Sequence, residues 1–199
     1  VRYDHISYTN DNQWSPRVSA AFALSKKSFF RAAWGHYHQS QLINQMEVNY
    51  EATEFRESEM AKHYVAGIEH LFSNGLNIRL EAYYKDITLP SIIYQNLRDQ
   101  WEVFPETRND MAKLYISGAR SKGIELFMKY DVGKKISWWF SYALAKAEEH
   151  VDSIDFNGLL DKQTGWLPRY NNQNHTVYVD FIYRPAKTWL LNVSWQYWN

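Results

Sequence analysis

The chain has 199 residues and carries 22 Lys and Arg against 22 Asp and Glu, so its formal net charge is zero. This balance excludes the excess of Lys and Arg that is typical of nucleic-acid-binding proteins. The lack of Cys excludes disulfides and thiol chemistry. No apolar run reaches the roughly 18 residues that a membrane-spanning helix needs. Aromatic residues nevertheless make up 17% of a chain whose mean hydropathy is −0.56, a combination typical of strands with one apolar and one wet face.

The N-terminal third of the chain predicts strands, because apolar and polar residues alternate with a period of two. The opening sequence VRYDHI has the pattern of a strand interior and not of a signal peptide, so we expect the chain to be a fragment of a longer protein. In residues 17–24, Val18 and Phe22 fall on one face and Arg17 on the other. Residues 28–38 and 61–72 predict the next strands.

The middle and C-terminal parts repeat the pattern. In residues 77–85, Ile78 and Leu80 share one face while Arg79 and Glu81 share the other, whereas a helix would scatter them around its circumference. Several of these segments reach the ~9–11 residues needed to cross a bilayer at a tilt. Nine strands are predicted in all: residues 1–8, 17–24, 28–38, 61–72, 77–85, 122–130, 136–146, 175–183 and 189–198.

The connections between these strands alternate in length. Short turns rich in Gly, Pro, Ser, Asn and Lys are predicted at residues 25–27, 73–75, 131–135 and 184–187. Long connections are predicted at residues 39–60, 89–119 and 148–174, with residues 9–14 as a short loop on the same side. Outer-membrane barrels have this rhythm of short periplasmic turns and long extracellular loops. The sequence therefore predicts an all-β fold, an antiparallel up-and-down transmembrane β-barrel segment.

Aromatic residues gather near both ends of the predicted strands, as in the two interfacial belts of a membrane barrel. Toward the long connections they are Trp34, Tyr37, Tyr83, Tyr84, Trp195, Tyr197 and Trp198. Toward the short turns they are Phe72, Tyr130, Trp138, Tyr183 and Trp189.

Short stretches with a characteristic order and spacing extend over nearly the whole chain. They are SPR (15–17), FRAAWG (30–35), YVAGIE (64–69), LEAYYKDI (80–87), SKGIEL (121–126), SYALAKAE (141–148), PR (168–169) leading to His175, and WQY (195–197). In this order and spacing the chain resembles the C-terminal half of the barrel of a TonB-dependent outer-membrane receptor. The chain departs from the family pattern before His175: where the family often has Asp-x-x-His, this chain has Asn171, Asn172 and Asn174 before the His.

The resemblance implies a barrel of about 22 strands with a plugged lumen, of which these nine would be about the eleventh to the nineteenth. Residues 1–199 would then form part of one barrel domain, and the plug, the first half of the barrel and its last strands would lie elsewhere in the protein. It also implies a Gram-negative outer membrane, contact with its lipid, and TonB as a partner through absent N-terminal parts. The function would be active uptake of a scarce nutrient, without an enzymatic step and without a cofactor.

Three groups of residues have side chains that could form a metal site or a catalytic site. His36 and His38 share a strand face, but no third ligand follows at a spacing that a metal site needs. The acidic segment after Glu148 contains the sequence DFNG, yet an EF-hand would need Glu where Thr164 stands. Glu81 and Glu125 on neighbouring strands could suggest a glycosidase, although nearby Lys and Arg favour a lumen of mixed charge. The sequence therefore predicts neither a catalytic nor a metal site.

Ligand contacts are expected in the long connections and at inward positions near them, where aromatic rings and charged groups could hold a siderophore, a corrinoid or an oligosaccharide. A passive or enzymatic barrel of the porin or lipase type is one alternative, and a soluble carbohydrate-binding β-protein is another. The candidate ligand-binding residues are Tyr37, Tyr83, Lys85, Trp101, Arg120 and Trp166.

Overall fold

The computed structural model describes residues 1–43, 46, 54–96, 111–131, 135–156, 159–161, 165–169 and 172–199. In this part of the chain the regular elements are β-strands, and no helix is long and apolar enough to cross a membrane. The strands are β1 (Arg2–Ile6), β2 (Asp11–Ser15), β3 (Arg17–Ser25), β4 (Ser28–Gln39), β5 (Glu59–Leu71), β6 (Leu76–Asn96), β7 (Met111–Tyr130), β8 (Ile136–Phe156), β9 (Leu159–Asp161), β10 (Gly165–Pro168), β11 (His175–Ala186) and β12 (Trp189–Trp198).

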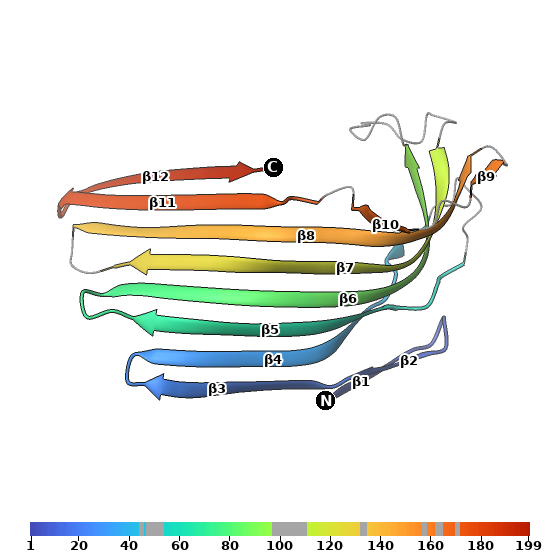
Figure 1. The fold of residues 1–199 in the computed structure, drawn as a ribbon, viewed down its shortest axis with the longest axis horizontal. Coiled ribbons are helices and arrows are strands. Elements are labelled where there is room, and N and C mark those ends of the chain that lie inside the picture. Colours follow the sequence, from blue (N-terminus) through green and yellow to red (C-terminus); the bar gives the residue numbers. More distant parts are fainter. Residues whose placement is uncertain are drawn as a thin grey trace.

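The long strands form one open antiparallel sheet in the order β12-β11-β8-β7-β6-β5-β4-β3 (Figure 1). Each of these strands pairs with its sequence neighbour, except that the short strands β9 and β10 intervene before β11 and pair with β8. The expected antiparallel up-and-down fold is confirmed. The sheet does not close on itself, so β3 and β12 remain as its two edges.

The turns at residues 25–27, 73–75 and 184–187 lie together at one end of this sheet, where β7 also ends and β8 begins (Figure 1). At the turn between β5 and β6, the amide of Gly75 donates to the carbonyl of Phe72 at 3.0 Å. Gly75 has a φ of 84°, a conformation that glycine adopts without the steric penalty of a side chain. The opposite end of the sheet, where β6 and β8 end and β7 begins, is called the outer end below.

The register between strands places the apolar residues of all eight long strands on one face. Leu80 is directly opposite Ile68 on one side and Leu126 on the other, and the same phase continues to both edges. Because paired residues point to the same side of a sheet, these positions form one continuous apolar face. One row across it reads Phe22, Phe30, Ile68, Leu80, Leu126, Tyr142, Val177 and Tyr197.

The other face of the sheet, called the polar face below, carries charged and hydrogen-bonding side chains. Arg31 Nη1 lies 2.6 Å from Glu69 Oε2, and Asn77 Nδ2 donates to Glu69 Oε1 at 2.8 Å. Near the β12 edge of the sheet, on the same polar face, Ser194 Oγ donates to Asp180. The alternation read from the sequence is therefore present in three dimensions as two chemically different surfaces.

The expected aromatic belts are divided between these two faces. Trp34 and Tyr84 lie on the apolar face, and both are directly opposite Tyr64, which was not among the expected belt residues. Tyr83 lies on the polar face because it is adjacent to Tyr84 in a regular strand. Tyr37 also lies there, because it is three residues from Trp34 and side chains alternate along a strand. Assigning Tyr37 and Tyr83 to a belt was wrong, as it was for Trp198, whose partner Thr176 lies on the polar face.

Strands β6, β7 and β8 continue well beyond their predicted outer ends. The segments 89–119 and 148–174 were expected to be loops, but β6 reaches Asn96, β7 starts at Met111 and β8 reaches Phe156. Register shifts between Thr88 and Ser91 and on both sides of Ile116 bend this extension. The tips of β6, β7 and β8 turn away from the plane of the sheet in Figure 1.

The apolar side of the sheet changes in this extension. Ile87 lies two residues beyond Lys85 on the polar face, and its partner Ala119 is 1% exposed. On the opposite side, Asp86 and Arg120 now occupy the positions that continue the apolar face. The fully buried core of the described chain lies here, on the side that is polar lower in the sheet. Its members are Ala112, Leu114, Ile116, Ala119 and Val151, with Ile87, Ile93, Ile154 and Phe156 packed against them.

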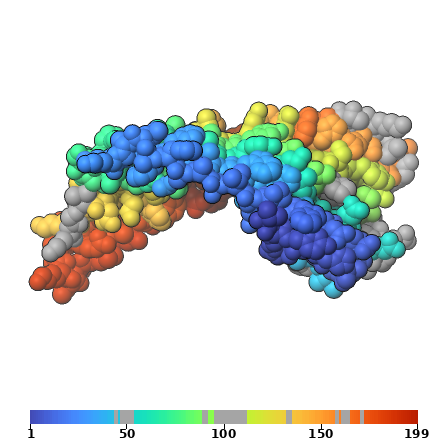
Figure 2. All heavy atoms as spheres, turned by 90° about the horizontal axis from the view of Figure 1, so that it is seen from below, coloured from blue at the N-terminus to red at the C-terminus, as the bar shows by residue number. Residues whose placement is uncertain are grey.

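The first two strands form a separate hairpin at the outer end. Residues 9–14 were expected to be a loop, but Asp11–Ser15 form strand β2, which pairs with β1. Pro16 separates β2 from β3, because proline has no N–H for a ladder, although its carbonyl still accepts from the amide of His36 at 2.9 Å. In Figure 2 the hairpin (dark blue) projects from one side of an arched molecule.

A charge in the centre of the apolar face should impair membrane assembly. We expect Leu80→Arg to cost about 2–4 kcal/mol if that position meets the middle of a bilayer. The fraction of heat-modifiable barrel in purified outer membranes would measure this. Glu81→Arg adds the same side chain one residue away on the polar face and serves as the control. Equal assembly of the two variants would contradict the assigned orientation.

Removing a side chain from the extension core should loosen the extension alone. Ile116 is 3% exposed, and truncation of such a residue usually costs about 2–5 kcal/mol. We expect Ile116→Ala to speed amide hydrogen exchange in the outer parts of β7 and β8 and to leave barrel assembly intact. Ile124→Ala, eight residues further along the same strand and 50% exposed on the apolar face, should not have this effect.

Candidate ligand-binding site

Cationic and aromatic side chains line the outer end of the polar face on β3–β6. The register places Arg17, His63 and Lys85 in one row across these strands. Tyr37 lies one step further toward the outer end, and Tyr83 lies one step below. These five residues are called the cationic rim. They lie just below the level at which the sheet changes its apolar side.

Ring contacts hold the cationic rim together. Arg17 Cζ lies 4.2 Å from the centroid of the Tyr37 ring, and this ring stacks on His63 with centroids 4.4 Å apart. Lys85 Nζ lies 5.2 Å from the centroid of Tyr83. Contacts between a cation and a ring face are worth roughly 0.5–1 kcal/mol at exposed sites. They orient the two tyrosines without neutralising the charges beside them.

Two glycines give the side chains of the rim the room that they occupy. A Cβ added to Gly123 would lie 2.8 Å from Tyr83 Oη and 2.8 Å from the carbonyl oxygen of Leu144. A Cβ added to Gly35 would lie 2.9 Å from Arg17 Cγ. Tyr83 and Arg17 therefore lie over positions where a larger residue could not be accommodated without displacing them.

The charge of the rim is not balanced locally. Among the described residues of β3–β6, the row of Arg17 and Lys85 and the rows on either side of it contain no carboxylate. Glu81, two residues below Tyr83 on β6, is the first on that strand. Two permanent cations, a histidine and two aromatic rings can bind a ligand that presents negative groups together with flat apolar surface.

On the same side of the sheet, one buried carboxylate and one partly buried carboxylate lie near arginines. Arg169 Nε lies 3.6 Å from Glu149 Oε2, and Arg56 Nη2 lies 3.4 Å from Glu59 Oε1. Burial raises the pKa of both Glu59 and Glu149, and the neighbouring arginines oppose that rise. Glu59 lies one row further out than Tyr37, and Glu149 lies in the row of Tyr37.

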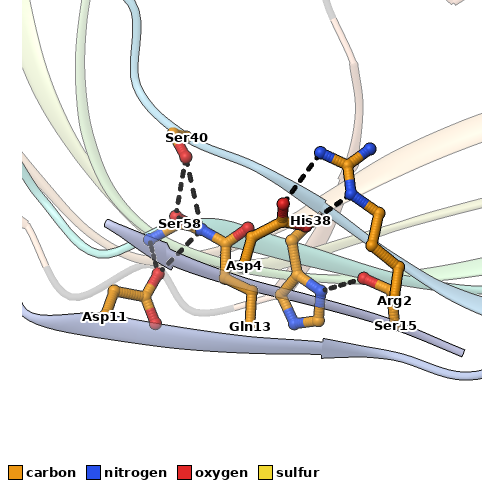
Figure 3. A network of polar contacts seen from close by, with 8 residues as sticks. All are labelled: Arg2, Asp4, Asp11, Gln13, Ser15, His38, Ser40 and Ser58. Carbon is orange, nitrogen blue, oxygen red and sulfur yellow. Dashed lines mark hydrogen bonds and ion pairs between the residues drawn. The ribbon is translucent and has the colours of Figure 1, made fainter. Parts of the chain in front are cut away.

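The β1–β2 hairpin is attached beside the rim by a network of polar contacts (Figure 3). Gln13 is 4% exposed and its Nε2 donates to Ser40 Oγ at 3.2 Å and to Ser58 Oγ. The amide of Ser58 donates to Asp11 Oδ2 at 3.2 Å. Ser15 Oγ lies 3.1 Å from Nδ1 of His38, the residue that follows Tyr37 on β4. The hairpin therefore depends on β4 and on residue 58 for its position.

The structure separates the six residues that were predicted to bind ligand. Tyr37, Tyr83 and Lys85 come together in the cationic rim, and Trp101 lies outside the described residues. Arg120 lies on the side that continues the apolar face, where its Cζ is 4.0 Å from the ring centroid of Trp166. Arg120 is therefore not part of the cationic rim, and its contact with ligand stays a prediction.

Sequence reasoning missed two members of the rim, Arg17 and His63. The alternation of apolar and polar residues already placed Arg17 on the polar face. Its closeness to Tyr37 and His63 depends on the pairing of β3, β4 and β5, which periodicity does not specify.

Of the other groups that the sequence suggested as chemical sites, the two histidines have different partners and the two glutamates are neighbours. In the described ranges no three His, Cys, Asp or Glu side chains gather as metal ligands would. His36 packs edge-on against Trp34 at 4.9 Å, while His38 contacts Ser15. Glu81 and Glu125 are directly opposite each other on β6 and β7. Thr164 and part of the acidic segment lie outside the described residues.

An open antiparallel meander with one apolar face, one polar face and strands that extend past the apolar zone is a segment of a membrane β-barrel. The family model for the TonB dependent receptor-like β-barrel matches residues 1–199, and the chain belongs to this family. It is a family of outer-membrane transporters and not of enzymes. A comparison with curated proteins found no match.

The attachment of the hairpin should weaken in acid. Hydrogen bonding from Ser58 lowers the pKa of the Asp11 carboxyl. The ionised Asp11 carboxylate therefore stabilises the attachment fully above the pKa of about 4 that it has in the unfolded chain. This stabilisation is lost as the pH falls through the lower pKa of the folded state. Spin labels at Asn10 and Glu57 should give a distance distribution that broadens below about pH 4.

The matched variants test the role of Asp11 in this transition. Asp11→Asn should broaden the distribution at neutral pH and remove its pH dependence. Asp4→Asn should leave the transition unchanged, because the ion-pair partner of Asp4 is Arg2 on the same strand. A transition that persists in Asp11→Asn would assign the acid response to another group.

Proposed function

We propose that this chain is the ligand-facing part of an active outer-membrane transporter that takes up a scarce nutrient. The observation that supports this proposal is the cationic rim, a group of orienting aromatic rings and unneutralised cations at the outer end of the polar face. In a barrel with the apolar face toward lipid, the rim faces the lumen near its external mouth. A solute that enters from outside would contact the cationic rim soon after it reaches the lumen.

Residues 1–199 would supply part of the barrel domain, and the plug and the segment that contacts TonB would come from other parts of the protein. Ligand held at the rim and the plug would pass through the lumen when TonB moves the plug. We propose no covalent change in the ligand, because transport needs binding and release alone.

The chemistry of the rim favours one class among the expected ligands. Arg17 and Lys85 would form charge-assisted hydrogen bonds with carboxylate, catecholate or phosphate oxygens. Tyr37 and Tyr83 would pack against rings or apolar surface. A siderophore with anionic groups fits this combination better than a neutral oligosaccharide, and a corrinoid with a phosphate group is the next candidate.

Uptake by the complete protein tests this proposal. A strain that lacks the gene would first be grown on a panel of siderophores, corrinoids and oligosaccharides to find the nutrient that it can no longer use. For that nutrient, Lys85→Glu should weaken binding by about 10- to 100-fold, since a hydrogen bond to a charged group is worth about 1.5–3 kcal/mol. The dissociation constant of the purified receptor measures this.

The control is Lys129→Glu, which changes charge equally at the opposite end of the polar face. It should leave the dissociation constant unchanged. Normal growth of the deletion strain on every nutrient would contradict transport, whereas equal effects of the two lysine variants would contradict the rim as the binding site.

A further inference from the structure

His63 lies within the cationic rim and has both ring nitrogens available. Its ring is half-buried and stacks on Tyr37 with centroids 4.4 Å apart. Within the described part of the chain, no side chain forms a hydrogen bond or an ion pair with this imidazole. A neutral imidazole has one donor and one acceptor, and in the imidazolium both nitrogens donate. His63 can therefore change its charge without breaking a contact inside the protein.

The charged groups that face His63 on the polar face are cations. Lys85 of β6 is directly opposite it on one side, and Gly35 of β4 on the other. Beyond Gly35, which has no side chain, the same row reaches Arg17 of β3. The other neighbours of His63 on this face carry no permanent charge. They are Ala33 and Tyr37 on β4, Ala61 and Val65 on β5, and Tyr83 and Ile87 on β6.

This arrangement opposes a positive charge on His63 as long as no anion is bound. Arg17 and Lys85 are always protonated at neutral pH, and like charges nearby disfavour a further one. The next carboxylate outward along β5 on the same face is Glu59, four residues away, and Arg56 Nη2 already lies 3.4 Å from its Oε1. The described neighbours therefore offer His63 no counter-charge.

We propose that His63 takes up a proton from the solvent when an anionic ligand binds to the cationic rim. The negative groups of the ligand would supply the missing counter-charge, and the imidazolium would donate a charge-assisted hydrogen bond to them. His63 is then a specificity-determining residue that strengthens the binding of anions over neutral solutes. Proton uptake at His63 rests on the proposed function, because it requires an anionic nutrient at the rim.

The proton uptake makes ligand affinity depend on pH in a defined direction. The complex binds one more proton than the free receptor, so a lower pH favours the complex. Histidine titrates near pH 6.5 in model peptides, which places the change between about pH 6 and pH 8. The expected gain over this range is about tenfold, the lower end of what a hydrogen bond to a charged group contributes.

A probe whose own charge is constant over this range tests the proton uptake. Pyrene-1,3,6,8-tetrasulfonate carries permanent negative groups on a flat ring system, and its fluorescence would report binding to the complete receptor in detergent. The dissociation constant should rise about tenfold from about pH 6 to about pH 8. Titration calorimetry near neutral pH, in two buffers of different ionisation enthalpy, should show uptake of up to about one proton per bound probe.

Substitutions of His63 distinguish proton uptake from a structural role. His63→Phe keeps a ring for Tyr37 to stack on but cannot accept a proton, so it should bind the probe with the weaker, high-pH affinity throughout. His63→Arg is charged at every pH and should keep the stronger, low-pH affinity. A merely structural role would weaken binding in both variants. His70→Gln, a histidine substitution at the other end of β5, should behave like the wild type.

The outcomes separate this proposal from the proposed function. A wild-type dissociation constant that does not change with pH, or a pH dependence that persists in His63→Phe, would overturn the proton uptake. His63→Gln decides in the same way if His63→Phe does not assemble. Failure of the wild type to bind the probe at any pH would overturn both the proton uptake and the rim as an anion site. Nutrient uptake by the same proteins reports separately on transport.

Discussion

In hydrocarbon every backbone N–H and C=O group needs a partner within the protein, because lipid supplies none. The ladder from β3 to β12 meets this constraint by giving each inner strand two hydrogen-bonded neighbours. Register then decides the chemistry of both faces, since a slip of one residue moves every side chain of a strand to the other side. The row from Phe22 to Tyr197 keeps its phase through all eight strands, and the continuous apolar face follows from that agreement.

The same ladder serves two environments. Between the short turns and the row of Tyr84 the exterior is apolar and the interior polar, as lipid outside and water inside require. Beyond Lys85 the exterior carries charged residues, and a buried apolar core begins at Ile87 on the interior side. Two features lie near this level: the cationic rim on the polar face and the hairpin network beside it. Their common position reflects the border at which the solvent of the outer face changes from lipid to water.

The sequence predicted the polar face of Tyr83 and Lys85 and the position of Tyr37 near the outer end, but not their assembly with Arg17 and His63. Local alternation assigns a side to each residue, whereas a cluster across four strands depends on three registers at once. Arg120 was predicted as a ligand contact together with Tyr37, Tyr83 and Lys85. Its phase with Ile124 places it on the opposite side of the sheet from these three residues.

By itself, the sequence determined the strand periodicity, the turns near Gly75 and the family, because these depend on local spacing and composition. Tertiary structure alone decided how far β6–β8 run, where the apolar side changes, and that Asp11–Ser15 pair as a strand instead of forming a loop. The physical reason is that an extended hairpin gains its stability from a core contributed by several strands, here around Ile116 and Val151. No single segment contains that information.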